Sequence, residues 1–254
     1  AEIQGTGAAS PLVGKTVITE GVVTAVYEEG GKNGFFLQAG GSGSEKHPGD
    51  ASDGIFVYMG TNTNYPQRGE SVRVSGQVGE HYTQTQITMT SMDTLDDALE
   101  APKAVEIETL PAGDEAREPY EGMLVRPKGP YTVTNNYTLN TYGELGLAPG
   151  ERAHRTPTDV VAPGAPAAEL QAKQDAEVVY LDDGRTKDYF RTDKNTPLPY
   201  IVTSEGGVKS IRTGDQVDFQ TDVVVDYSFD QWRFQPLELC LLYTSLSGLA
   251  RQTA

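Results

Sequence analysis

The sequence contains a single cysteine and three histidines among its 254 residues. Cys240 alone cannot form a disulfide within the chain or supply a cluster of thiolates to a metal. The histidines His47, His81 and His154 are scattered along the sequence, which disfavours a histidine-based metal site. The cysteine content therefore neither indicates nor excludes secretion.

Basic residues and long hydrophobic runs are also scarce. The 20 Lys and Arg residues are outnumbered by 36 Asp and Glu residues, and the formal net charge is −16. Residues 1–100 and 101–254 each carry −8, so no basic domain lies behind an acidic tail. This balance argues against a protein that holds phosphates by bulk charge and against adsorption to an anionic membrane. No run approaches the roughly 20 apolar residues of a membrane helix, so we expect no membrane partner.

Sequence motifs of catalysis are missing as well. The chain contains no GxSxG, HExxH, GxxxxGK or GxGxxG segment. No catalytic residues are predicted, and an independently acting enzyme is the least favoured interpretation.

What the sequence does contain is alternation of apolar and polar residues, with 28 Gly and 15 Pro residues for turns. The first hundred residues predict five strands, at Thr16–Tyr27, Gly34–Gln38, Asp53–Met59, Ser71–Val78 and Thr83–Met89. Gly21 stands where a bulge or sharp coil would bend the long first strand. Five strands of this kind suit a small closed barrel.

An internal repeat extends this prediction to the second half of the chain. Residues Arg68–Gln86 match Thr213–Gln231 without a gap, at a constant offset of 145. The matched pairs are Gly69 with Gly214, Glu70 with Asp215, Val72 with Val217, Val78 with Val223, Tyr82 with Tyr227 and Gln86 with Gln231. Further upstream, Glu20-Gly21 recurs as Glu121-Gly122. We interpret the two halves as copies of one β unit.

The predicted fold is mainly all-β, with two OB-like five-stranded barrels. The first barrel occupies residues 1–100 and a linker residues 101–117. The second OB-like module spans 118–239 and is enlarged by an insertion at about 149–190, in which Pro166 begins a short helix. Residues 240–254 fit neither copy and are left as an unassigned tail.

Candidate binding residues follow from the barrel prediction, because OB-folds bind oligonucleotides or oligosaccharides on the face of strands 2 and 3. On that face, Phe36 and Tyr58 are predicted platforms for stacking bases. The basic residues expected near the path of the phosphate backbone are Lys32, Arg68 and Arg73. The alternative interpretation is that the aromatic residues belong to the core.

The second copy supplies further candidates. Tyr227, Trp232 and Arg233 lie in the densest aromatic cluster of the chain and could stack a base and contact a phosphate; the alternative is an ordinary hairpin with cross-strand aromatic pairs. Asp182 and Asp183 are candidate ligands for Ca²⁺ or Mg²⁺, which take oxygen ligands. The alternative for this pair is a solvated turn.

Several stretches along the sequence, taken together, resemble the non-catalytic N-terminal region of secreted bacterial nucleases of the ExeM/NucH type. The resemblance runs from about Glu2 to Pro236. It is carried by IQGTGAASPLVGKTVITEGVVTAVY, GFFLQ, SDGIFVY, RGESVRVSGQV, QTQIT, YEGMLVRPKGPYTVTNNYTLNTYGELGL, PTDVVAPG, VYLDDG and VVVDYSFDQWRFQP. No single motif is decisive, but their number and order make the resemblance fairly specific.

The resemblance implies an extracellular accessory region whose partners are single-stranded or duplex nucleic acid and the nuclease's own catalytic domain. That catalytic domain belongs to the endonuclease/exonuclease/phosphatase family and uses a Ser-Asp-His triplet, yet none of the three histidines here follows Ser-Asp. The leading hypothesis is therefore a substrate-positioning module without catalytic residues. The alternatives are a spacer or protein-interaction module and an oligosaccharide-binding module.

Overall fold

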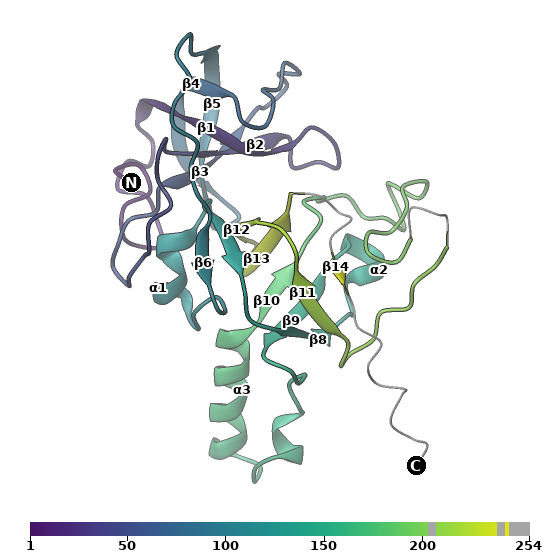
Figure 1. The fold of residues 1–254 in the computed structure, drawn as a ribbon. Helices are drawn as coiled ribbons and strands as arrows, with labels where there is room; N and C mark the ends of the chain where they lie inside the picture. Colours follow the sequence, from purple (N-terminus) through teal and green to yellow (C-terminus); the bar gives the residue numbers. More distant parts are fainter. Residues whose placement is uncertain (203–206, 238–241, 244–254) are drawn as a thin grey trace.

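The computed structural model describes residues 1–202, 207–237 and 242–243 (Figure 1). Most of its elements are strands, which confirms the prediction of a mainly all-β protein. Apart from the backbone of Leu242–Tyr243, the predicted tail lies outside the described residues. No helix in the described part of the chain is long and apolar enough to cross a membrane.

The first half forms the predicted closed five-stranded barrel. Its strands are β1 (Thr16–Tyr27), β2 (Gly34–Gln38), β3 (Gly54–Tyr58), β4 (Ser71–His81) and β5 (Gln84–Thr94). They are arranged in the order β1-β2-β3-β5-β4, and β4 closes the barrel by pairing with β1. Alternate residues such as Phe35, Leu37 and Val57 fill the interior, because successive side chains of a strand point to opposite faces.

Gly21 does not mark the bulge that the sequence suggested. The irregularity in β1 falls between Val23 and Ala25, where the register with β2 shifts. Gly21 is required for a close approach instead, because a Cβ there would lie 2.7 Å from the carbonyl oxygen of Gln38. Both features help β1 to curve around the barrel.

The second half contains the remaining elements, which are mostly short. The strands are β6 (Val105–Ile107), β7 (Leu124–Pro127), β8 (Tyr131–Asn135), β9 (Leu145–Pro149), β10 (Val179–Leu181), β11 (Gln216–Phe219), β12 (Val223–Ser228), β13 (Gln231–Pro236) and β14 (Leu242–Tyr243). The helices are α1 (Asp114–Arg117), η1 (Glu118–Tyr120), α2 (Leu139–Tyr142), η2 (Pro157–Asp159) and α3 (Ala165–Glu177). The strand order in the sheet is β14-β11-β8-β9-β10-β13-β12-β7-β6.

This nine-stranded sheet departs from a simple five-stranded barrel, yet it repeats the pairings of the first one. The segments β7 and β8 together play the part of β1, since β7 pairs with β12 and β8 pairs with β11 and β9. Likewise β11 and β12 together play the part of β4, and β10 runs parallel to β13 as β3 does to β5. The second module is therefore OB-like, with its first and fourth strands each broken in two.

The register of the strands tests the sequence repeat. Gly69 and Gly214 both have positive φ, and their backbone N–H groups donate to the equivalent carbonyls of Val23 and Val133, so this part of the repeat is confirmed. The match of Glu20-Gly21 with Glu121-Gly122 is wrong. Gly21 lies opposite Val72, and Tyr131 lies opposite Val217, the repeat partner of Val72, so the residue equivalent to Gly21 is Tyr131.

At the C-terminal end of the repeat, the structural alignment differs from the sequence alignment by two residues. The last pair before the hairpin turn is His81 with Gln84 in the first barrel and Ser228 with Gln231 in the second module, an offset of 147. Gln86 is therefore equivalent to Arg233 rather than to Gln231. The hairpin residue Tyr82 is accordingly equivalent to Phe229 rather than to Tyr227.

The additional residues of the second module are spread over two loops. One runs from 150 to 178, between β9 and β10, and holds α3; the other runs from 182 to 215, between β10 and β11. The insertion thus extends well beyond the predicted limit of 190. The predicted linker is also partly ordered into the second module, because β6 pairs with β7 and α1 ends at Arg117.

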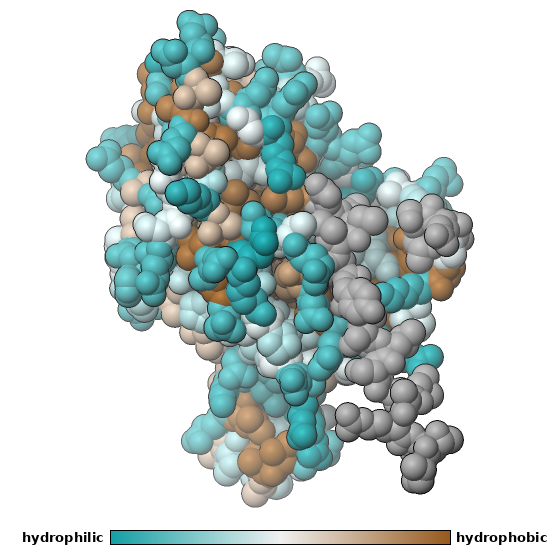
Figure 2. All heavy atoms as spheres, in the orientation of Figure 1, coloured by the Kyte–Doolittle hydropathy of each residue, from teal (hydrophilic) through white to brown (hydrophobic). Residues whose placement is uncertain are grey.

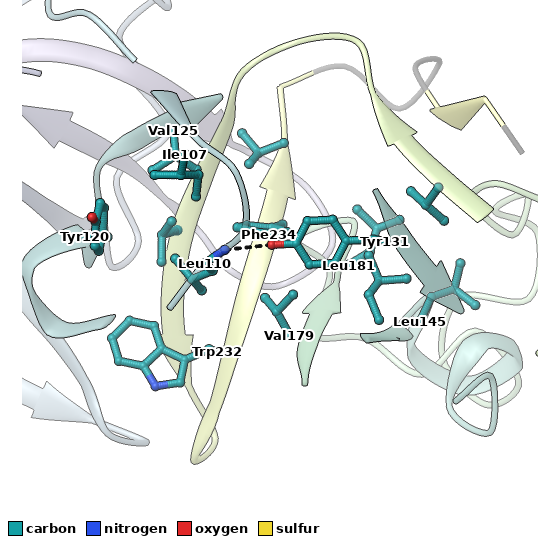
Figure 3. Packing of buried hydrophobic residues seen from close by; sticks show 14 of the residues in the cluster. Ile107, Leu110, Tyr120, Val125, Tyr131, Leu145, Val179, Leu181, Trp232 and Phe234 are labelled. Carbon is teal, nitrogen blue, oxygen red and sulfur yellow. Dashed lines mark hydrogen bonds between the residues drawn. The ribbon is translucent and has the colours of Figure 1, made fainter. Parts of the chain in front are cut away.

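A large hydrophobic core fills the second module (Figure 3). Tyr131 and Phe234 meet edge to face at its centre, with ring centroids 5.6 Å apart. The hydroxyl of Tyr131 accepts a 2.8 Å hydrogen bond from the backbone N–H of Leu110, which ties the segment before α1 to the core. Buried Tyr hydroxyls usually find such a partner.

A smaller cluster joins the two modules. Phe36 and Phe56, on the outer face of β2 and β3, pack with Leu124 of β7 and Val224 of β12. The backbones also touch at Gly54, where a Cβ would lie 2.2 Å from the carbonyl of Gly122. Figure 1 shows β12 and β13 directly beneath the first barrel, while α3 projects from the opposite end of the second module.

Candidate binding cleft between the two modules

The face that the sequence predicted for nucleic acid is covered by the second module. Phe36 is only 1% exposed, because Leu124 and Val224 pack against it. Tyr58 is half-buried against the same cluster. Phe36 therefore occupies the core position that the alternative interpretation gave it, and no base can stack on it.

Two of the three basic residues predicted beside that face, Arg68 and Arg73, lie on the outside of the barrel, whereas Lys32 lines the cleft described below. Arg73 is exposed on β4 and forms an ion pair with Glu20 on β1, with an N–O distance of 2.6 Å. Arg68 is exposed in the turn before β4. Neither residue lines the cleft described below.

The candidates of the second module are also mostly interior. Trp232 is 3% exposed, and its indole N–H donates a 2.9 Å hydrogen bond to Asp114. Tyr227 is half-buried and packs on Trp232 with ring centroids 4.6 Å apart, as the cross-strand alternative expected. Arg233 is buried too, but it lines a cavity.

This cavity, of about 480 Å³, lies at the junction of the modules and is called the junction cleft below. The first barrel contributes its β1–β2 loop (Gly31, Lys32) and its β4–β5 hairpin (His81, Tyr82, Gln84), and the second module contributes the equivalent β8–β9 segment (Thr138, Tyr142, Glu144) and β12–β13 hairpin (Ser228, Phe229, Gln231). In OB-folds the loops at these two positions border the ligand. The structure thus brings both pairs of loops to one place.

The rim of the junction cleft is aromatic. Tyr82 and Phe229, 61% and 48% exposed, stack with ring centroids 4.6 Å apart and an interplanar angle of 22°. The backbone N–H of Phe229 donates to the carbonyl of Tyr82 at 2.7 Å, which joins the two hairpins. Both residues have positive φ, 48° and 54°, because each is the first residue of a two-residue hairpin turn whose two central residues both have positive φ.

The floor of the junction cleft is a network of buried charges. The guanidinium of Arg233 contacts Asp182 at 2.8 Å and Glu144 at 2.9 Å. Lys32, from the first barrel, forms a 2.6 Å ion pair with fully buried Asp226 of the second module. The amide of Gln235 links the two pairs by donating to Asp182 at 3.3 Å and to Asp226 at 3.1 Å.

Asp182 and Asp183 are buried, so the solvated turn that the sequence suggested is not what the structure contains. Asp182 accepts from Arg233, and Asp183 accepts hydrogen bonds from the hydroxyl of Tyr189 and the backbone N–H of Arg185. Each of these donors thus binds a carboxylate that the sequence suggested as a ligand for Ca²⁺ or Mg²⁺. In the described segments, no three His, Cys, Asp or Glu side chains are grouped to hold a metal.

Burial and the neighbouring charge of Asp182 raise the pKa of Asp183 to about 7, although the hydrogen bonds from Tyr189 and Arg185 act in the opposite direction. The folded protein thus keeps a proton on Asp183 up to about pH 7, whereas the unfolded chain loses it near the ordinary pKa of 3.8. The stability that Asp183 contributes therefore falls as the pH rises between these two values.

We expect Asp183→Asn, which stays neutral, to raise the melting temperature at pH 8 and to leave it almost unchanged near pH 4. Thermal unfolding followed by circular dichroism at both pH values measures the difference. Asp97→Asn, at an exposed position, is the matched control and should show no such dependence on pH. A lower melting temperature for Asp183→Asn at pH 8 would contradict the expectation.

Arg185 and Thr186, which line the junction cleft, begin a locally basic segment of this acidic chain. Within it, Arg185 pairs with Asp193 and Arg191 pairs with Asp188. Residues 185–194, RTKDYFRTDK, hold four basic and two acidic residues. The backbone N–H groups of Thr186 and Lys187 donate to the carbonyl of Gly30 at 2.9 and 3.0 Å, which places this segment beside the β1–β2 loop. Phe190 within it is 63% exposed.

Lys32 and Arg233, both named as candidates from the sequence, thus line the junction cleft, whereas the aromatic rim was not among the predicted sites. Two signals could have found it: the repeated hairpins, which predict equivalent tips in both modules, and the local excess of Lys and Arg after Gly184. Comparison with known proteins adds no assignment, because no protein-family model and no curated protein matches this chain.

Proposed function

We propose that this chain is a non-catalytic binding region that holds single-stranded nucleic acid in the junction cleft, as the accessory part of an extracellular nuclease. One observation carries the proposal: equivalent loops of two OB-like modules converge on one cleft and place two exposed aromatic rings, Tyr82 and Phe229, at its rim. The proposal moves the binding site from the covered face of β2 and β3 to this cleft.

Aromatic rings suit a single strand because its bases are free to stack. Stacking of one base on an aromatic side chain contributes about 1–3 kcal/mol and does not require a particular base. A duplex keeps its bases stacked on each other, so it gains nothing from Tyr82 and Phe229. The rim therefore favours single-stranded over duplex nucleic acid.

The charge distribution limits how phosphates can contribute. The face of the molecule in Figure 2 is largely hydrophilic, and the chain as a whole carries −16, so phosphates are repelled from most of the surface. Arg233 and Lys32 in the floor of the cleft are already paired with carboxylates. The segment 185–194 is where a phosphate backbone meets a local excess of positive charge.

Fluorescence anisotropy with a labelled oligothymidylate of about 12 nucleotides, within the site sizes usual for OB modules, tests the proposal. We expect saturable binding that weakens as salt is raised. Replacing both rim residues, Tyr82→Asn and Phe229→Asn, should lower the affinity by at least about tenfold, since two stacking contacts are lost. Asparagine is chosen because it tolerates positive φ better than alanine.

Arg73→Ala is the control, because Arg73 lies on the outside of the barrel and should leave the affinity unchanged. If no oligonucleotide binds even at low salt, the proposal is wrong and the spacer hypothesis is favoured. If binding occurs but the double variant binds as tightly as the wild type, the junction cleft is not the site.

A further inference from the structure

The helix of the insertion packs in an unusual way. None of the 13 residues of α3 (Ala165–Glu177) is buried. A helix that lies on a sheet normally turns an apolar stripe towards it. In α3, Gln174 is half-buried, and Gln171 and Asp175 are exposed. These three polar residues share one face because they are spaced by three and four positions, and all three line a cavity.

The helix is nevertheless firmly attached at its C-terminal end. The buried guanidinium of Arg117 donates to the carbonyls of Glu177 and Val178, both at 2.9 Å, and to that of Pro111 at 2.6 Å. Burial lowers the pKa of Arg117 to about 10, so the side chain stays charged at neutral pH. The last carbonyls of α3 are thereby satisfied, and the C-terminal end of the helix is fixed to the second module.

That space is a second cavity, of about 430 Å³, called the helix cavity below. Its floor is formed by Asn135 of β8, Tyr180 of β10 and an edge of Trp232 of β13. It lies on the α3 side of the β12–β13 hairpin, whose Gln231 also lines the junction cleft. The volume is within the range of about 300–1,000 Å³ that is usual for small-molecule sites.

The groups around the helix cavity disfavour an anion. Arg117 donates from all three of its nitrogens to backbone carbonyls, and His154 is paired with Glu177 at 3.2 Å. Three further carboxylates, Asp114, Asp175 and Asp230, line the cavity and would repel a phosphate.

The same groups suit hydroxyls. Amides and carboxylates can each accept a hydrogen bond from a hydroxyl, and the amides can also donate one. Gln171, Gln174 and Asn135 supply the amides, and the half-buried Tyr180 also lines the cavity. The amide nitrogens of Gln171 and Gln174 each make one hydrogen bond within the protein, to Asp175 and to the carbonyl of Arg155.

We infer that the helix cavity is a second binding site, which takes a neutral, hydroxyl-rich ligand of the saccharide class. The inference stands apart from the proposed binding of nucleic acid. It rests on a different cavity, and on side-chain amides in place of exposed aromatic rings. It also gives the enlarged loop between β9 and β10 a function, since α3 supplies one wall of the site.

Trp232 is the only tryptophan of the chain and lines the helix cavity, so its emission reports on occupancy. The experiment titrates neutral oligosaccharides of glucose, galactose and N-acetylglucosamine, and measures both tryptophan fluorescence and heat of binding. We expect at least one of them to give saturable changes in both signals. The double variant Gln171→Ala and Gln174→Ala should lower that affinity by at least about tenfold.

Glu169→Ala is the matched control, because Glu169 is exposed on α3 but does not line the cavity. Alanine is the best helix former, so none of these changes should unfold α3. The inference is overturned if no oligosaccharide of the panel binds, or if the double variant binds as tightly as the wild type. Retained saccharide binding in the Tyr82→Asn and Phe229→Asn variant would show that the two sites are separate.

Discussion

Replacing Arg233 with alanine is expected to lower the free energy of unfolding by about 3–5 kcal/mol, the usual cost of removing one partner from a buried ion pair. The guanidinium is almost fully buried and contacts both Asp182 and Glu144. Without it, two carboxylates remain in a low-dielectric region with no adjacent cation. Burial already raises the pKa of Asp182, and the loss of Arg233 would raise it further.

Urea denaturation followed by far-UV circular dichroism measures this loss. Arg73→Ala is the matched control, since an exposed ion pair contributes only about 0–1 kcal/mol. Combining Arg233→Met with Asp182→Asn and Glu144→Gln removes the uncompensated charges and should recover most of the stability. If Arg233→Ala costs no more than Arg73→Ala, the charge network does not hold the cleft together.

This prediction separates two roles that the sequence could not. A Trp-Arg dipeptide in an aromatic cluster is compatible with a surface contact to nucleic acid, where loss of the arginine would weaken binding and leave stability unchanged. In the structure Arg233 has the carboxylates of Asp182 and Glu144 as partners, which lie 51 and 89 residues away. Long-range partners of this kind leave no local pattern in the sequence.

The first barrel could be predicted closely because it depends on local patterns. Alternation fixed which residues of Gly34–Gln38 share a face, and the predicted bounds of β1 and β2 agree with the structure. Alternation does not say what lies beyond each face. Phe35 points into the barrel and Phe36 out of it, yet both are buried, because the second module covers the outer face.

The second module was harder to predict for two physical reasons. Its first and fourth strands are each interrupted, so β7, β8 and β11 are too short to show clear alternation, and so is the three-residue β10. The correct alignment is then set by hydrogen-bond register, not by residue identity. The match of Glu20-Gly21 with Glu121-Gly122 illustrates this, since a dipeptide can recur without any equivalent pairing.

Replacing Lys32 with alanine is expected to be about as costly as losing Arg233, again about 3–5 kcal/mol. The ammonium pairs with Asp226 at 2.6 Å and lies 5.1 Å from the ring centroid of Phe56, so it joins the first barrel to the second module. Burial alone would raise the pKa of Asp226, but Lys32 and Arg233 keep it below its usual value.

The destabilisation caused by Lys32→Ala should depend on pH in a defined direction. In the wild type Asp226 stabilises the fold above its unfolded pKa of about 3.9, and this contribution disappears as the pH falls through its lower folded pKa. Without Lys32, less positive charge opposes the rise that burial causes in the pKa of Asp226, and the ionised carboxylate then destabilises the fold. The difference between Lys32→Ala and the wild type should therefore be largest near pH 7 and shrink towards pH 3.

A double-mutant cycle distinguishes an ion pair from a packing effect. Lys32→Met combined with Asp226→Asn should be more stable than Lys32→Met alone, because no buried charge is left unpaired. Gln235 hydrogen-bonds to both Asp226 and Asp182, so Lys32 and Arg233 belong to one network. Their combined loss should thus differ from the sum of the single losses by about 0.5–3 kcal/mol. Additive losses would mean that the junction cleft is lined by two independent ion pairs.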